Sequence, residues 1–434
     1  MPKSFQIQIP HITRVEGHGN LVVRVTDGHV EKAEWQVVEA PRFFEAFVQG
    51  RRWDEIQAVV SRICGICSIS HSLVSIQAIE NALHVQVSPE VQKLRSLTHA
   101  SEILQSHILH IGYLVAPDLF KAPSVIPLVE NQREVVQKII ELHRIANQWS
   151  DLLAGRTTHP ITLIPGGFTR TPSLKEFENL QHDLSTATKL TNQIASVILS
   201  VAHQIPHFER ETEYIALQQP GQYSFESGQI ASSDLPELTP VENFESVTNE
   251  YVTNQSTAKW ARWHRGAYAV GALARYNLNH KFLRPAAAQL AHQLGIKSKC
   301  INPYANSLIQ LVECVQILGD AQELIDFFLE NPHPLNRESI TPRAGEGVAA
   351  IEAPRGILFH RYQLNDQGIC RSANLCIPTN QNHGNLQKDI ETLLPQILHD
   401  DQESIRQLLE MLVRSYDPCI SCSTHFLNIK FIDS

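Results

Sequence analysis

The spacing of hydrophobic residues divides the chain into a short β-rich start and a long helical remainder. Apolar and polar residues alternate over the first 40 positions, and NLVVRVTDGHVEKAEWQVV predicts two strands joined by a turn at Asp27 and Gly28. After that, apolar residues mostly recur at helical spacing. The pattern predicts a mainly α protein with a small N-terminal β-sheet, of the α+β class.

Several of the predicted helices carry end signals. Ser88, followed by a proline, predicts the start of a long helix, and Ser173 is a second predicted N-cap. Gly155 predicts the end of the helix between them. Residues 218–243 are rich in Pro, Gly and Ser and predict a surface excursion with short strands. Further helical patterns cover about 258–295, 303–330 and 386–414.

The composition is that of an ordinary globular protein. The 434 residues are 43% hydrophobic and 19% charged, and a net charge of −9 is not typical of proteins that bind nucleic acid or membrane surfaces. No apolar run reaches the roughly 20 residues of a spanning helix, and the N-terminus lacks a signal-like apolar segment. Eight cysteines are too few for a disulfide scaffold. We therefore expect a cytoplasmic protein whose thiolates serve as metal ligands or redox groups.

Two Cys-x-x-Cys pairs lie near opposite ends of the chain. The first is in RICGICSISH at 62–71, the second is in DPCISCSTH at 417–425, and about 350 residues separate them. Two such turns can hold one metal through four thiolates. The separation is far longer than the ~15–20 residues usual for structural zinc, and no βαβ pattern of a thioredoxin-like dithiol surrounds either pair. From spacing alone, zinc, another four-thiolate metal site and unrelated redox or buried cysteines all remain open.

Residues beside the two pairs favour a reactive metal site. Arg62 places a cation next to the first pair, which favours thiolates. His71 lies four residues after Cys67, close enough to hydrogen-bond a ligating sulfur. Asp417 puts an acid next to the second pair, which is useful where protons are moved.

The two motifs resemble the signature motifs of nickel–iron hydrogenase large subunits. Stretches similar to that family occur in the same order as HITRVEGHG, APRFFEAFVQGR, IEAPRG and NLCIPTNQN. The resemblance covers essentially the whole chain. It implies one large-subunit domain over 1–434, with long helices and both Cys pairs meeting at a buried site. Its parts would be a β-rich segment (about 1–60), a helical body (about 61–425) and a tail (426–434).

The resemblance also implies a catalytic centre. Cys64 and Cys419 would be terminal nickel ligands, and Cys67 and Cys422 would bridge nickel to an iron that carries carbon monoxide and cyanide, a Ni-Fe(CN)2(CO) centre. Thiolates suit such soft metals. The implied reaction is the reversible heterolytic cleavage of H2 to protons and electrons.

Further residues match family positions around that centre. Glu16 would relay the proton, although the sequence alone favours a pairing of Glu16 with Arg14. Arg355 would lie over the open metal face and donate hydrogen bonds beside the cyanides, with Asp417 as its partner. The remaining residues expected against the cofactor are Thr379, which would donate to the other cyanide, Pro354 and His71.

A second cation site is implied near the C-terminus. Its ligands would be Glu45, the carbonyl of Leu375 and the imidazole of His425. Mixed oxygen ligands favour Mg2+, although Fe2+ is found at this position in some relatives.

Two features depart from the family pattern. Ser106 stands where several relatives have Asp, so no acid role is expected there and the electrostatics around Arg355 would be softer. The stretch FLNIKFIDS follows His425. In the family a dedicated protease often removes such an extension after nickel insertion, and either fate of this tail is open.

The absence of a ferredoxin-like cysteine run implies partner chains. The resemblance implies an obligate iron–sulfur small subunit, further electron-acceptor subunits, a maturation chaperone and a C-terminal protease as partners. We expect no nucleic-acid partner and no direct membrane span. The motifs look most like the cytosolic multisubunit group, which is linked to nicotinamide, a deazaflavin or a heterodisulfide reductase. A regulatory H2 sensor and a four-thiolate zinc protein are the alternatives. Quinone-binding relatives have lost the four cysteines, which argues against that class.

Overall fold

The computed structural model describes residues 4–332, 335 and 337–424 and is mainly helical, as predicted. Its long helices are α3 (Ser68–Leu83), α4 (Pro89–Leu109), α7 (Arg133–Ala154), α8 (Leu174–Val201), α12 (Asn306–Glu330), α13 (Pro378–Ile397) and α14 (Gln402–Ser415). Shorter ones are α1 (Phe44–Val48), α2 (Ile56–Val60), α5 (Ala116–Leu119), α6 (Ile126–Asn131), α9 (Phe244–Thr248), α10 (Ala272–Asn279), α11 (Pro285–Gln293) and α15 (Ile420–Ser423). None of the described helices combines the length and apolar content needed to cross a bilayer.

The predicted N-terminal hairpin is confirmed. Strands β1 (Phe5–Ile9), β2 (Gly19–Thr26) and β3 (His29–Val37) form an antiparallel sheet in that order. Asp27 and Gly28 both have positive φ, as a tight two-residue hairpin requires. The N-terminal segment was expected to be β-rich to about residue 60. The sheet ends at Val37, and the helices α1 and α2 follow it in the rest of that segment.

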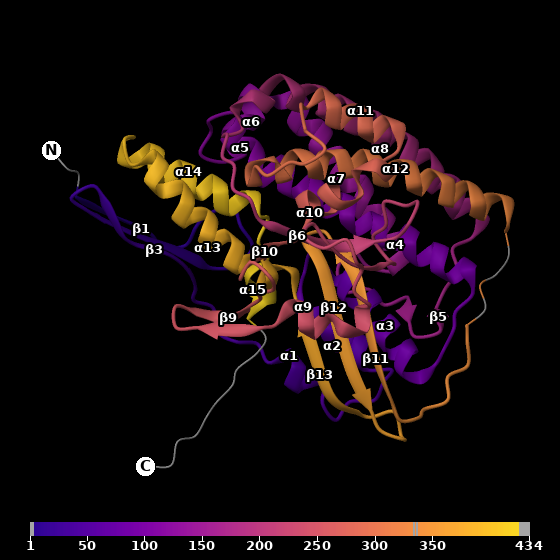
Figure 1. Cartoon of the computed structure of the whole chain (residues 1–434). Helices are drawn as coiled ribbons and strands as arrows, with labels where there is room; N and C mark the ends of the chain where they lie inside the picture. The colour runs from indigo at the N-terminus through magenta and orange to yellow at the C-terminus, as the bar shows by residue number, and fades with distance from the viewer. Residues whose placement is uncertain (1–3, 333–334, 336, 425–434) are drawn as a thin grey trace, which may run out of the picture.

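The predicted helix ends are also found. Ser88 caps α4, and Ser173 forms a capping box with Glu176 at the start of α8. Gly155 ends α7 in the left-handed conformation. Helices α4, α7, α8 and α12 pack together into the main helical layer (Figure 1).

A second sheet, which the sequence patterns did not predict, lies against α3. Strands β11 (Gly345–Ala353), β12 (Gly356–Leu364) and β13 (Cys370–Cys376) are antiparallel and pack on that helix. The helical prediction for 258–295 is wrong over its first part, where strands β9 and β10 lie. The remaining strands are β4 (Leu163–Ile164), β5 (Gly167–Phe168), β6 (Glu213–Gln218), β7 (Gln229–Ser232), β8 (Tyr251–Thr253), β9 (Ser256–Trp260) and β10 (Tyr268–Ala269).

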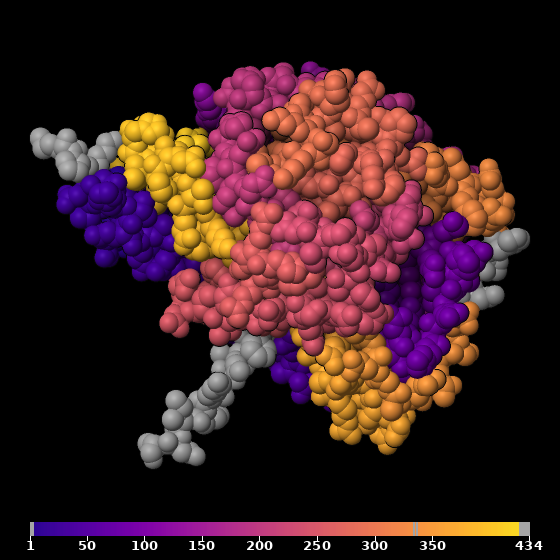
Figure 2. All heavy atoms as spheres, in the orientation of Figure 1, coloured from indigo at the N-terminus to yellow at the C-terminus, as the bar shows by residue number. Residues whose placement is uncertain are grey.

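The two ends of the chain share one hydrophobic core. Apolar residues of the N-terminal sheet, such as Val23 and Trp35, pack with Ile390 of α13 and Leu409 of α14. The N-terminal sheet and these C-terminal helices lie side by side (Figures 1 and 2). Burial of this shared apolar surface draws together two cysteine pairs that are distant in sequence.

Candidate metal centre

The four cysteines of the two motifs meet in one buried cluster. The sulfurs of Cys64, Cys67, Cys419 and Cys422 all lie within 4.8 Å of one another. The Sγ atoms of Cys64 and Cys419 are 3.6 Å apart, and those of Cys419 and Cys422 are at disulfide contact, a bond that must be open for both to bind a metal as thiolates. The first pair lies directly before α3, with Cys67 at its N-cap, whereas the second pair spans the start of the short helix α15, with Cys419 before it and Cys422 within it. Four converging sulfurs make a donor set for a soft transition metal.

The first pair is electrostatically asymmetric. The backbone N–H groups of Ile66 and Cys67 donate to Cys64 Sγ over 3.2 and 3.1 Å. Burial opposes ionisation of Cys64, but the hydrogen bond from the Cys67 thiol and the charge of Arg355 lower its pKa. The hydrogen bond to Cys64 and burial raise the pKa of Cys67. Arg62 is exposed, so Arg355, and not Arg62 as the sequence indicated, is the cation that acts on this pair.

Arg42 joins the two motifs directly. Its guanidinium Nη2 donates to the carbonyl of Ile63, over 2.6 Å, and to the carbonyl of Ser421. One residue thus binds the backbone just before Cys64 and just before Cys422. Sequence reasoning passed over Arg42, although it stands in the stretch APRFFEAFVQGR.

Glu16 lies at the edge of the cluster. Its Oε2 accepts a hydrogen bond from Ser421 N over 3.1 Å, and its carbonyl accepts one from Ile420 N over 3.0 Å. The next residue must be glycine, because Gly17 has φ +85° and an added Cβ would lie 2.8 Å from Ile420. The alternative pairing with Arg14 is not present, because Arg14 pairs with Asp118 at 2.6 Å.

Arg355 and Asp417 form a buried pair beside the sulfurs. Arg355 Nε donates to the Asp417 carbonyl over 2.6 Å, and its Nη2 donates to Asp417 Oδ1 over 3.0 Å. Asp417 Oδ2 accepts from Gln310. The left-handed backbone of Asp417, with φ 47°, turns the chain into the second pair. No acceptor among the described residues reaches Arg355 Nη1, which is a buried donor.

The other residues predicted to touch a cofactor lie nearby or brace the site. The Thr379 hydroxyl accepts from Cys419 N over 3.1 Å, which leaves its own hydrogen to donate elsewhere. The carbonyl of Pro354 accepts from Arg275. Nδ1 of the buried His71 lies 3.3 Å from Nε2 of His360.

The residues predicted for a second cation are only partly described. Glu45 is buried, and its Oε1 accepts from Leu375 N over 2.9 Å and from Lys259 Nζ over 3.1 Å. Lys259 also donates to Glu250 over 2.8 Å. Burial opposes charge on Lys259, but the two carboxylates raise its pKa. The prediction for His425 lies outside the described residues.

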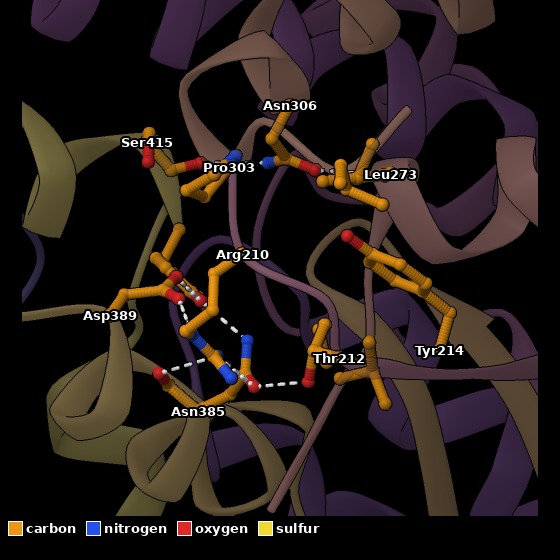
Figure 3. A pocket seen from close by; sticks show the side chains of 13 residues that line it. Arg210, Thr212, Tyr214, Leu273, Pro303, Asn306, Asn385, Asp389 and Ser415 are labelled. Carbon is orange, nitrogen blue, oxygen red and sulfur yellow. Dashed lines mark hydrogen bonds and ion pairs between the residues drawn. The ribbon is translucent and has the colours of Figure 1, made fainter. Parts of the chain in front are cut away.

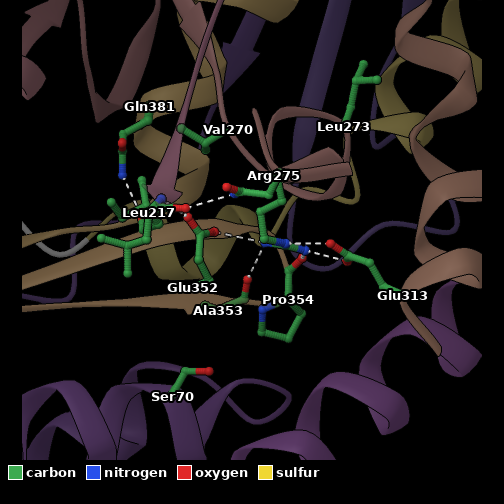
Figure 4. A network of polar contacts seen from close by, with 12 residues as sticks. Ser70, Leu217, Val270, Leu273, Arg275, Glu313, Glu352, Ala353, Pro354 and Gln381 are labelled. Atoms are coloured by element: carbon green, nitrogen blue, oxygen red, sulfur yellow. Dashed lines mark hydrogen bonds and ion pairs between the residues drawn. The ribbon is translucent and has the colours of Figure 1, made fainter. Parts of the chain in front are cut away.

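A buried ionic network behind the site was not predicted. Arg275 donates two hydrogen bonds of 2.7 Å to Glu313 and one of 3.0 Å to Glu352 (Figure 4). It also donates to the carbonyls of Ala353 and Pro354, over 3.0 Å each. These carbonyls directly precede Arg355, so the network fixes the backbone from which Arg355 extends.

A second network of hydrogen bonds holds Tyr416, the residue directly before Asp417. Tyr416 donates to Asp389 and accepts from Asn385 over 2.7 Å. Arg210 completes the set by donating to Asp389 and to Asn385 Oδ1 around a small cavity (Figure 3). Asn385 and Asp389 are four residues apart on α13, but no spacing links them to Arg210 or Tyr416, which only the fold brings to them.

Comparison with known proteins identifies the family. The family model for nickel-dependent hydrogenases matches residues 42–139 and 233–425, which include all four clustered cysteines, and a HoxL-like model matches residues 6–40. The chain belongs to the nickel-dependent hydrogenase family. It is the catalytic large subunit of such an enzyme, an oxidoreductase that acts on H2, and neither the sensor nor the zinc alternative is favoured.

Individual hydrogenases match over almost their full length. The sulfhydrogenase 1 subunit alpha of Pyrococcus furiosus is 30% identical, with 98% of each chain covered. The NAD-reducing hydrogenase HoxS subunit beta of Cupriavidus necator is 28% identical over 98% of this chain and 95% of that protein. A solved NAD+-reducing [NiFe]-hydrogenase has a TM-score of 0.83 at 27% identity, with 97% and 99% covered. The expected large-subunit fold is thereby confirmed.

Proposed function

We propose that the four clustered cysteines hold a Ni-Fe(CN)2(CO) centre at which H2 is reversibly split. The observation that carries this proposal is the buried set of four sulfurs beside a buried arginine donor with no acceptor among the described residues. Cys64 and Cys419 are assigned as terminal nickel ligands, and Cys67 and Cys422 as bridging ones. The bound centre would supply the two-electron chemistry of hydrogen.

The polar residues around the cluster have separate tasks. Nη1 of Arg355 is suited to donate to a cyanide nitrogen, and the hydroxyl of Thr379 to the other cyanide. Asp417 keeps Arg355 in place through two hydrogen bonds. Pro354 and His71 contribute shape and support next to the cofactor.

Glu16 is the residue assigned to carry the proton away. Its backbone pairs with that of Cys419, and its Oε2 accepts a hydrogen bond from Ser421 N over 3.1 Å, so Glu16 is held beside the second cysteine pair. The residue is half-buried and therefore has one side toward the solvent. A carboxylate in this position can take a proton from a thiol and pass it outward.

A hard cation is proposed at Glu45, the carbonyl of Leu375 and His425. Mg2+ fits the oxygen-rich donors, with Fe2+ as the second choice. Glu45 and the backbone of Leu375 lie together, because Glu45 Oε1 accepts a hydrogen bond from Leu375 N over 2.9 Å.

The enzyme is proposed to work with partner chains in the cytoplasm. The names of the relatives describe alpha, beta and A subunits of larger enzymes. We infer an iron–sulfur small subunit that takes the electrons, further acceptor subunits, a maturation chaperone and a protease that acts on the tail after residue 425. The physiological acceptor is a property of those partners.

The assignment of the centre is tested on enzyme purified without oxygen together with its co-encoded subunits. We expect one nickel and one iron per large subunit, and infrared bands of one carbon monoxide and two cyanides. Cys64→Ser should abolish metal incorporation, because a serine hydroxyl is a far poorer nickel ligand at neutral pH. Cys300→Ser, which lies outside the cluster, is the matched control. Zinc alone in mature protein, or nickel and activity retained in Cys64→Ser, would contradict the assignment.

A further inference from the structure

A second acid, Glu102, lies against the first turn of α3, the helix that directly follows the first cysteine pair. Glu102 of α4 is 1% exposed, and its carboxylate accepts hydrogen bonds from Ile69 N, over 2.5 Å, from Ser70 N, over 2.9 Å, and from the Ser70 hydroxyl. These donors form the first turn of α3, which begins directly after Cys67. Glu102 is thus bonded to the two residues that follow Cys67 by two and three positions.

A line of hydrogen bonds leads from Glu102 to the surface. The Ser70 hydroxyl lies 3.1 Å from His99 Nε2, and His99 Nδ1 lies 2.9 Å from Glu226 Oε1. His99 is fully buried, whereas the side chain of Glu226 is 26% exposed. Glu226 lines a surface groove of about 840 Å³ together with Ala100 and Ile103, the neighbours of His99 on α4. A continuous series of hydrogen-bonding groups thus runs from the first turn of α3 to that groove. It consists of the Glu102 carboxyl, the Ser70 hydroxyl, the His99 imidazole and the Glu226 carboxylate.

The bonding of Glu102 differs from that of a purely structural buried acid. Glu80, on α3, is also buried, but Arg95 neutralises it through two hydrogen bonds of 2.8 and 2.6 Å. Among the described residues, Glu102 accepts hydrogen bonds only from neutral groups, and His99, which can become a cation, is reached through the Ser70 hydroxyl. Burial raises the pKa of Glu102 to about 7, against the charge of His99 and the Ser70 hydrogen bond that lower it. Glu102 can therefore gain and lose a proton near neutral pH.

We propose that Glu102, Ser70, His99 and Glu226 form a proton relay between the metal centre and the groove, separate from Glu16. This inference rests on the proposed function. A proton released at the first cysteine pair protonates Glu102, which donates to Ser70 while Ser70 donates its own proton to His99 Nε2. His99 releases the proton at Nδ1 to Glu226, and water in the groove receives it. No electron moves along this line, and each group returns to its starting protonation state.

The test uses the anaerobic enzyme with its co-encoded subunits and two variants of the relay. Glu102→Gln and His99→Gln keep hydrogen-bonding groups of similar size but cannot pass a proton. We expect both to retain nickel and iron with unchanged carbon monoxide and cyanide bands, and to exchange H2 with deuterated water at least roughly tenfold more slowly. Glu80→Gln is the matched control and should exchange at the parent rate when folded.

A readout independent of turnover is the infrared absorption of the protonated carboxyl group. Buried Glu352 also has its pKa raised to about 7 and contributes a carboxylic-acid band to every variant. The spectrum of the parent minus that of Glu102→Gln should therefore show a further buried carboxylic acid that titrates near neutrality, whereas the spectrum of the parent minus that of Glu80→Gln should not. The relay is refuted if His99→Gln, which lies farther from the cysteines, exchanges within about twofold of the parent, or if the difference between the parent and Glu102→Gln contains no such band. Missing nickel or missing cyanide bands in the parent enzyme would instead refute the proposed function.

Discussion

The surroundings of Arg355 determine which side chain can replace it. Two of its nitrogens donate to Asp417, and the buried Nη1 has no acceptor among the described residues. A lysine would keep the positive charge but has no planar fork, so it cannot serve Asp417 and a cofactor ligand together. We expect Arg355→Lys to retain nickel and iron and to lose activity roughly a hundredfold. Activity is measured as H2-dependent dye reduction, and nickel and iron are measured by metal analysis.

The control for that substitution is an arginine that is near Arg355 in the sequence but lies at the surface. Arg361, on β12, pairs with Glu245 and Glu346 at the surface. Arg361→Lys should leave activity unchanged, because exposed ion pairs contribute little. Comparable losses in both variants would show that Arg355 acts only through the stability of the sheet.

At the scale of elements, the contact between α3 and β11 positions the first cysteine pair. A Cβ added to Gly347 would lie 2.0 Å from the carbonyl oxygen of Ala78 and 2.4 Å from the nitrogen of Ala82, both backbone atoms that cannot turn aside. Gly347→Ala should therefore lower the free energy of unfolding by at least about 2 kcal/mol, measured by denaturant titration. Glu346→Ala, at the exposed neighbouring position, is the control. Equal stability of Gly347→Ala and the parent would mean that the two elements can separate at little cost.

The ionic network behind the site gives a pH-dependent prediction. Burial opposes ionisation of Glu313, but the charge and hydrogen bonds of Arg275 and the hydrogen bond of His107 lower its pKa to about 2. Because this pKa lies below the roughly 4.3 of an unfolded glutamate, the stabilisation is complete above pH 4.3 and is lost as pH falls through 2. Glu313→Gln should cost about 3–5 kcal/mol near neutral pH, and the difference from the parent should shrink below pH 4. A difference in unfolding free energy that is constant from pH 7 to pH 3 would contradict this assignment.

The sequence predicts those features whose signals are local. Ser88, Ser173 and Gly155 mark helix ends through contacts within a few residues, and the Asp27–Gly28 turn depends only on its own backbone. The sheet β11–β13 was missed because its strands are buried on α3 and do not alternate cleanly between apolar and polar residues. The cysteines were found because they occur as motifs. Arg42, Arg275 and Glu102 act through partners far away in sequence, and no spacing identifies such pairs.

At the scale of the whole molecule, one buried carboxylate joins three distant parts of the chain. Asp118 accepts hydrogen bonds from Arg14, over 2.6 Å, and from Arg414 Nε and Nη2, over 2.8 and 2.9 Å. Arg14 precedes Glu16 by two residues, and Arg414 precedes Asp417 by three. Glu16, the proposed proton carrier, and Asp417, the partner of Arg355, are therefore both positioned from the same anchor.

Asp118→Asn tests whether this anchor supports the site. The substitution removes the charge that compensates two largely buried guanidinium groups, so we expect a loss of about 3–5 kcal/mol in unfolding free energy. Amide hydrogen exchange should rise in residues 10–20 and 410–424 before the rest of the protein is affected, because these segments meet through Asp118. Asp234→Asn is the matched control: Asp234 also binds an arginine through two hydrogen bonds, but Arg265 is 42% exposed, and the expected loss is below about 1 kcal/mol. Uniform exchange across the chain in Asp118→Asn would show that the two ends are held together by their shared apolar core alone.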